Sequence, residues 1–297
     1  MRKKRTVSLV LGSGGARGLA HIGIIDWLER HDFEIRSISG SSMGALIGGI
    51  YAAGELESYT RWVRALEQID VLRLLDFSFR SSGLLKGERV IRTLKELIGD
   101  RRIEDLPISF TAVAANVEDE REVWLNHGSL FDAIRASIAI PTVFTPVQYR
   151  GKTLLDGGLI NPVPIAPTLR DKTDITIAVS VSGKADPAFD RIPEASKRNS
   201  NDEGYRRKII QFIDQIQQKL GREDEEEMSV FEVVSNSLET MQNTIARFQL
   251  AAYTPDVIIE LPRNACAFYE FYRGDEMINL GRKRAEAVLR SYIHGGD

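Results

Sequence analysis

Two short apolar segments near the start of the chain, residues 6–11 and 35–39, each lead directly into a glycine-containing turn and then into a helix-forming segment. The two strand–turn–helix units cover residues 6–29 and 35–53. Strands that alternate with helices in this way lie parallel in a sheet, and their nearly continuous apolar character is typical of strands covered on both faces. The pattern predicts an α/β protein with three layers, α/β/α, and a mainly parallel central sheet.

Later segments extend this alternation along the chain, and we expect one domain over residues 1–297 with a variable helical insertion at about 184–250. An apolar stretch at 71–85 has no clean period; it is part of a lid or acyl pocket, or else core between two helices. The predicted strands are 6–11, 35–39, 110–117, 121–125, 175–181 and 257–261, and the predicted helices are 19–29, 43–53, 55–69, 86–99, 130–139, 205–220, 229–248 and 277–292.

The insertion contains two long amphipathic helices, predicted at 205–220 and 229–248. Their apolar spacing permits a short coiled-coil contact, but packing as a helical hairpin on the domain is the favoured role. Between them, the acidic run 223–227 precedes the second helix, where the helix dipole favours negative charge, so it does not indicate a metal site. The apolar stripe of the second helix consists of Phe231, Val234, Leu238, Met241, Ile245 and Phe248.

Composition excludes several classes of protein. The 297-residue chain has a formal net charge of −3, which argues against binding to duplex nucleic acid. Its single cysteine, Cys266, permits no intrachain disulfide and no cysteine-based zinc site. No run approaches the roughly 20 apolar residues of a membrane-spanning helix. We therefore expect a cytoplasmic protein. Action at a membrane surface is compatible with this expectation.

The turn at residues 40–44, Gly-Ser-Ser-Met-Gly, carries the first candidate for catalysis. In the pattern G-x-S-x-G, the flanking glycines let two backbones approach while the central serine is held in a strained, exposed conformation. A strand before the turn and a helix rich in small residues after it are the context that this motif requires. Ser42 is therefore the candidate nucleophile, supported by Gly40 and Gly44.

The turn at residues 12–18, Gly-Ser-Gly-Gly-Ala-Arg-Gly, can direct backbone N–H groups at an anion. That anion is either a nucleotide phosphate or the oxyanion formed when a nucleophile attacks an ester. The dinucleotide pattern G-x-G-x-x-G read from Gly12 fails because Arg17 stands at its last glycine. With a serine elbow downstream, an oxyanion hole accounts for more of the sequence.

The base that would activate Ser42 is not evident among the four histidines, His21, His31, His127 and His294. Only His294 follows in the order Ser, Asp, His, and it is the fourth residue from the chain end. Asp156 is the alternative, because Gly157 and Gly158 permit a tight turn that could bring its carboxylate to the serine. Partial burial would raise its low intrinsic pKa. An ordinary Asp-Gly turn between strands is the other interpretation.

Together these motifs resemble the patatin-like phospholipases, in particular the shorter bacterial members. The resemblance covers about residues 5–182 and rests on the segments 14–23, 40–44, 137–146 and 156–158. It implies a patatin-like fold and a Ser42/Asp156 dyad that hydrolyses lipid acyl esters without calcium or another cofactor. It also implies an oxyanion hole made by backbone N–H groups of Gly14, Gly15 and Ala16, with Gly18 in support.

Two residues of the glycine loop leave questions open. Ser13 stands where the family pattern has glycine. Arg17 either braces the loop or attracts an anionic head group.

The favoured function is a serine acyl hydrolase of the phospholipase A or lysophospholipase type. An alternative is a regulatory module with low turnover that binds a lipid or a partner through residues 205–250. A nucleotide-binding protein is a weaker third interpretation. Peripheral contact with a membrane and a homo-oligomer both stay open.

Overall fold

The computed structural model describes residues 4–67, 87–141, 143–189 and 230–294 of the chain. The apolar stretch at 71–85, the predicted helix at 205–220 and the acidic run at 223–227 lie outside these residues. No helix in the described ranges is both long and apolar enough to cross a membrane.

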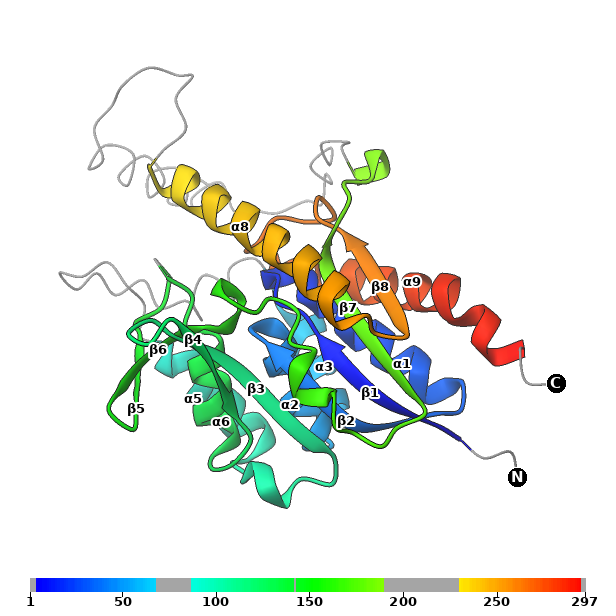
Figure 1. The fold of residues 1–297 in the computed structure, drawn as a ribbon, viewed down its shortest axis with the longest axis horizontal. Helices are drawn as coiled ribbons and strands as arrows, with labels where there is room; N and C mark the ends of the chain where they lie inside the picture. The colour runs from blue at the N-terminus through cyan, green and yellow to red at the C-terminus, as the bar shows by residue number, and fades with distance from the viewer. Residues whose placement is uncertain (1–3, 68–86, 142, 190–229, 295–297) are drawn as a thin grey trace.

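The described strands form one eight-stranded sheet in the order β5-β6-β3-β2-β1-β7-β8, with β4 paired to β3 off this path (Figure 1). β3, β2, β1, β7 and β8 run parallel, and β4, β5 and β6 pair antiparallel at one side. This confirms the mainly parallel sheet. The strands are β1 Arg5–Leu11, β2 Phe33–Ser41, β3 Ser109–Asn116, β4 Arg121–Leu125, β5 Val147–Tyr149, β6 Lys152–Asp156, β7 Ile175–Gly183 and β8 Val257–Pro262.

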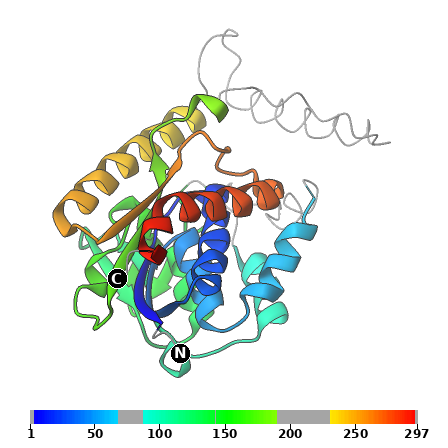
Figure 2. The ribbon, with the colours of Figure 1, turned by 90° about the vertical axis from the view of Figure 1, so that its right-hand side faces the viewer.

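Helices cover both faces of the sheet, which confirms the three-layer prediction. Figure 2 shows α8 on one side of the sheet and α1 with α9 on the other. The helices are the 3-10 helix η1 Gly15–Leu19, α1 Ala20–Arg30, α2 Met43–Ala52, α3 Leu56–Ala65, α5 Glu88–Ile98, α6 Leu130–Ser137, α8 Val230–Tyr253 and α9 Gly274–His294.

The alternation of side chains along β1 divides the apolar core into two parts. Val7, Leu9 and Leu11 belong to the large cluster shared with α1, α2 and α9. Val10 points to the opposite face and packs with Ala246 of α8 in a smaller cluster. Successive side chains of a strand point to opposite faces, so a strand buried on both must be apolar throughout.

Helix α8 contacts the sheet through a different stripe from the one that its apolar spacing indicated. Ala246 is buried, and Leu250 and Tyr253 pack beside it. In contrast, Met241 and Phe248 of the predicted stripe are exposed, Phe248 by 71%. The expectation that this stripe packs on the domain is wrong for Met241 and Phe248, because the face of α8 that carries Ala246, Leu250 and Tyr253 is the one that packs on the sheet.

Helices α1 and α9 cross at two glycines, which bring their backbones into contact. A Cβ atom on Gly23 would lie 1.9 Å from the carbonyl oxygen of Ile278, and one on Gly281 would lie 2.0 Å from that of Ala20. Neither position has room for a methyl group. The crossing fixes α1, and therefore the glycine loop that precedes it, against the C-terminal part of the chain.

We expect Gly281→Ala to lower the free energy of unfolding by about 1–3 kcal/mol, the range typical of overpacking. This loss should occur although alanine favours a helix over glycine by about 1 kcal/mol, because the added methyl forces the two helices apart. Urea unfolding followed by circular dichroism measures it. Lys283→Ala, an exposed change on the same helix, is the control; a stability of Gly281→Ala equal to that of the unaltered protein would contradict the close contact.

Candidate active site

Ser42 lies in the turn between β2 and α2, with a φ of 55° and a ψ of −121°. This conformation is strained for a residue with a side chain. The neighbouring glycines allow it. A Cβ atom on Gly44 would lie 1.9 Å from the carbonyl oxygen of Leu11, and one on Gly40 would lie 2.5 Å from the amide nitrogen of Ala45. The first turn of α2 therefore passes directly against the end of β1.

The pairing of both β2 and β6 with β3 brings Asp156 close to Ser42. Ala112 and Val113 pair with both β2 and β4, so these strands occupy opposite edges of β3. Ala114 pairs with both β4 and Asp156 of β6. Because a strand has only two edges, β6 must continue along the edge that β2 leaves. The last residue of β6 thus meets the end of β2.

The two side chains form a direct hydrogen bond although they are 114 positions apart in the sequence: Ser42 Oγ donates to Asp156 Oδ2 at 2.6 Å. The other carboxylate oxygen, Oδ1, accepts from the N–H of Gly158 at 2.7 Å. Gly157 packs against β3, where a Cβ atom would lie 2.1 Å from the carbonyl oxygen of Val113. The turn at 156–158 therefore orients the carboxylate toward the serine.

The environment of Asp156 changes its acidity. The residue is 2% exposed, and this burial raises the pKa of its carboxyl group to about 7, against the opposing effect of the hydrogen bonds from Ser42 and Gly158. A carboxyl group with such a pKa can accept a proton near neutral pH and release it again.

The described histidines bond elsewhere. His21 is fully buried and donates from Nε2 to the carbonyl oxygen of Gly12 at 2.8 Å. Burial lowers the pKa of His21 to about 4, and the bond to Gly12 opposes this shift, so the ring is neutral at pH 7. His31 donates to Trp27, and His127 pairs with Asn126. The side chain of His294 lies outside the described part of the chain.

The glycine loop after β1 departs from expectation at one residue. The N–H of Ala16 donates to the carbonyl oxygen of Phe268 at 2.9 Å, so it is already used. The N–H groups of Gly12 and Ser13 are also taken, by Val179 and Pro162. In the described structure this leaves Gly14 and Gly15 as the N–H donors of the loop for a bound oxygen, rather than Gly14, Gly15 and Ala16.

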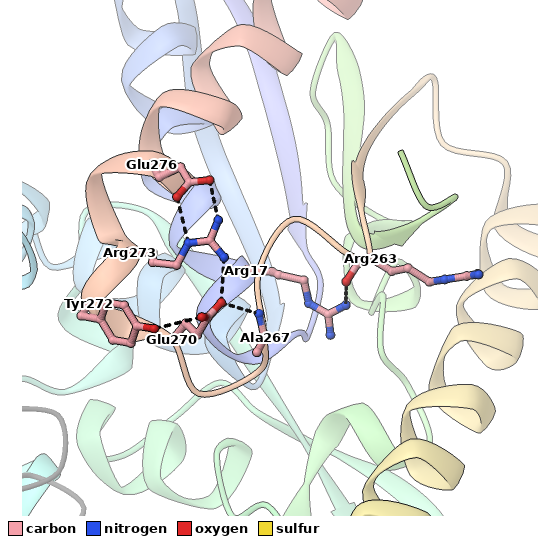
Figure 3. Close-up of polar contacts among 7 residues, drawn as sticks. All are labelled: Arg17, Arg263, Ala267, Glu270, Tyr272, Arg273 and Glu276. Atoms are coloured by element: carbon pink, nitrogen blue, oxygen red, sulfur yellow. Dashed lines mark hydrogen bonds and ion pairs between the residues drawn. The ribbon is translucent and has the colours of Figure 1, made fainter. Parts of the chain in front are cut away.

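Two further residues of η1 hold the loop in place. A Cβ atom on Gly18 would lie 2.5 Å from Cβ of Met43, so η1 packs against the elbow itself. Arg17 is buried, and it donates to the carbonyl oxygen of Gly14 at 3.4 Å. It also donates to the carbonyl oxygen of Arg263 at 2.6 Å (Figure 3). Burial and these acceptors favour the bracing role for Arg17 over contact with a head group.

The segment that provides Arg263 and Phe268 is itself held by charged side chains. Glu270 accepts from the backbone N–H of Ala267 and pairs with Arg273, which also pairs with Glu276. Figure 3 shows this network beside Arg17. The segment after β8 therefore has a fixed conformation where it meets the glycine loop.

Ser137 is a site residue that motif analysis did not single out. Its Oγ accepts from the N–H of Ser42 at 3.0 Å and donates to the carbonyl oxygen of Val113 at 2.6 Å. It thereby ties the elbow to β3 from the end of α6. The only available signal was its place at the start of the segment 137–146.

A cavity of about 540 Å³ lies away from this site, between α1 and α9. Trp27, Arg30 and Lys283 are among the residues that line it. It lies toward the C-terminal end of α1, whereas the glycine loop precedes the N-terminal end. We therefore do not assign it to the chemistry of Ser42.

The sequence profile of the patatin-like phospholipases matches residues 9–169, more than half of the chain. The chain belongs to the patatin-like phospholipase family. The matched region of this patatin-like protein contains Ser42, Asp156, Ser137 and the glycine loop, whereas α8, β8 and α9 lie beyond it.

Known proteins are similar to this patatin-like chain over different lengths. An NTE family protein of Mycobacterium bovis is 36% identical, over 96% of this chain and 92% of that protein. The lysophospholipase nte1 of Emericella nidulans is 33% identical, over 60% of this chain and 12% of the fungal protein. The crystal structure of VipD from Legionella pneumophila matches 97% of this chain and 67% of that one, with 11% identity and a TM-score of 0.47. Family and sequence relatives together support a lipid hydrolase.

The raised pKa of Asp156 predicts a pH-dependent stability difference between the patatin-like protein and its Asp156→Asn variant. Because the folded carboxyl holds its proton up to about pH 7 and an unfolded aspartate only to about pH 4, the carboxyl's contribution to stability is lost as the pH rises between these values. The melting temperature of Asp156→Asn relative to the unaltered protein should therefore rise from pH 4 to pH 8, as measured by calorimetry. An equal difference at both pH values would contradict the raised pKa.

Proposed function

We propose that the protein is a serine acyl hydrolase that cleaves lipid acyl esters with Ser42 as nucleophile and Asp156 as base. The observation that carries this proposal is the 2.6 Å hydrogen bond from Ser42 Oγ to Asp156 Oδ2 at a strained strand-to-helix turn. A serine hydroxyl is a weak nucleophile until a base within hydrogen-bond reach takes its proton.

The reaction has two steps, and each proton that is released in a step is taken up again in the same step. Ser42 Oγ attacks the ester carbonyl carbon while its proton passes to Asp156 Oδ2, and that proton then goes to the departing alcohol, which leaves an acyl-enzyme. Water attacks the acyl-enzyme in the second step, giving its proton to Asp156, which returns it to Ser42 Oγ as the fatty acid leaves. The raised pKa of Asp156 suits both directions of transfer.

The negative oxygen that forms on the carbonyl requires donors, and we assign this role to the N–H groups of Gly14 and Gly15. They belong to the loop that η1 packs against the elbow through Gly18 and Met43. Loss of one such donor costs about 3–4 kcal/mol in other hydrolases. Ala16 shapes the loop by its bond to Phe268 and is not assigned a donor role.

The substrate class that we propose is a lipid ester of the phospholipase A or lysophospholipase type. The family and the similarity to the Emericella nidulans lysophospholipase support it.

Ser42→Ala should lower kcat for an acyl ester by about a million-fold, as loss of the nucleophile does in other serine hydrolases. Asp156→Asn should lower it by about 10,000-fold, as the same change does in a serine protease triad. A fluorophosphonate should label the unaltered protein at Ser42 alone, read by peptide mass spectrometry. Ser41→Ala is the matched control, because Ser41 Oγ is buried without a hydrogen-bond partner in the described structure. Full hydrolysis by Ser42→Ala would refute the proposal, and lipid binding without labelling would favour the regulatory alternative.

The activity should depend on pH through Asp156. Because the base must be ionised to accept a proton, kcat/KM should rise tenfold per pH unit below about pH 7 and become constant above it. Hydrolysis of a short-chain p-nitrophenyl ester, measured from pH 5 to pH 9 with a check that the protein stays folded, tests this. A profile already constant at pH 5 would contradict an aspartic acid base of raised pKa.

A further inference from the structure

Arg17 has a third contact, which comes from the opposite layer of the molecule. Its Nη2 atom forms an ion pair with Oε1 of Glu239 on α8 at 2.7 Å. The Arg17 side chain is 5% exposed and that of Glu239 is 38% exposed. The remaining guanidinium contacts are the carbonyl oxygens of Gly14 and Arg263. Within the described residues, Arg17 therefore contacts one carboxylate, and that carboxylate comes from α8.

A buried guanidinium group needs a negatively charged partner that compensates its charge. When one partner of a buried ion pair is removed, the charge that is left behind destabilises its surroundings strongly, typically by more than the pair itself contributes. Arg17 lies inside η1, and Gly14, its carbonyl partner, begins the turn into that helix. A shift of Arg17 toward solvent would therefore move the segment that carries Gly14 and Gly15.

Helix α8 is fixed by apolar packing, so its carboxylate can hold Arg17 in place. Ala246 packs against Val10 of β1 and against Val163, which lies in the segment after the turn at 156–158. Glu239 precedes Ala246 by seven residues, which is two helical turns, so the two side chains lie on the same side of α8. The apolar contact fixes the helix, and the helix fixes the carboxylate.

We infer that Glu239 is a positioning residue: through its ion pair with Arg17 it holds the N–H groups of Gly14 and Gly15 at the place where the oxyanion forms. The inference rests on the proposed function. It makes α8, which lies outside the part that matches the family profile, a necessary support of the active site.

Two effects of Glu239 on the reaction would have opposite signs. As a positioning residue it speeds the reaction, because a donor displaced by about 1 Å can lose up to about 100-fold in rate. As a charge alone it would slow the reaction, because it neutralises a cation near a developing anion. The direction of change in a Glu239 variant separates the two.

Glu239→Ala should lower kcat for ester hydrolysis and the rate of Ser42 labelling by a fluorophosphonate about 10- to 100-fold, with KM changed less than about twofold. Glu239→Gln keeps an oxygen acceptor at the same reach and should lie between Glu239→Ala and the unaltered protein. Arg17→Gln should show a similar loss, and the double variant Arg17→Gln/Glu239→Ala should be no slower than the slower single variant. Ser237→Ala is the control on the same helix, since Ser237 Oγ bonds only to Val233 of α8 in the described structure.

An unchanged or faster labelling rate in folded Glu239→Ala would overturn the inference, and so would losses that multiply in the double variant. Hydrogen exchange of the amides at residues 12–19 gives a reading that does not need activity. Exchange there should be faster in Glu239→Gln than in Ser237→Ala, and equal exchange would overturn the inference even if Glu239→Ala fails to fold. If the unaltered protein neither hydrolyses esters nor is labelled, the proposed function has failed, while the exchange experiment still decides whether Glu239 holds the loop.

Discussion

The first turn of α2 passes the end of β1 with no space for a side chain, and the geometry of the site depends on this contact. Gly44 lies against the carbonyl oxygen of Leu11, where a Cβ atom would be only 1.9 Å away. This approach keeps Ser42 in its positive-φ conformation at the start of the helix. It also brings η1 onto the elbow, because Gly18 lies against Met43 at the same place. The nucleophile and the glycine loop are thus parts of one packed unit, not two flexible turns.

Burial of the Asp156 carboxyl is the second constraint, and it acts against stability. A carboxylate held out of water is costly to ionise, which raises its pKa to about 7. The bonds from Ser42 and the Gly158 N–H offset part of this cost. A base with a pKa near neutrality results, so the arrangement that weakens the fold at high pH is the one that suits proton transfer.

The C-terminal third of the chain completes the surroundings of the glycine loop. Phe268 takes the N–H of Ala16, and Arg263 accepts from Arg17. The segment that carries them is fixed by the Glu270–Arg273–Glu276 network, and α9 is locked to α1 by the glycine crossing. The contacts of Phe268 with Ala16, of Arg263 with Arg17 and of α9 with α1 each join residues more than 200 positions apart in the sequence. The loop that we propose to bind the oxyanion therefore depends on segments well beyond the matched family region.

The sequence by itself determined the parallel α/β architecture, the position of Ser42 in a strand-to-helix turn and the choice of Asp156 as its candidate partner, because apolar period and glycine placement are local properties. It did not identify β5, which is too short for a pattern, or the packing stripe of α8, which consists of Ala246, Leu250 and Tyr253 and not of Met241 and Phe248. The tertiary structure alone decided that β6 follows β2 along one edge of β3. It also decided that the N–H of Ala16 donates to Phe268, and that Ser137 and Arg17 brace the site. Each of these depends on which distant strand or loop lies alongside, and no local pattern of residues encodes that neighbour.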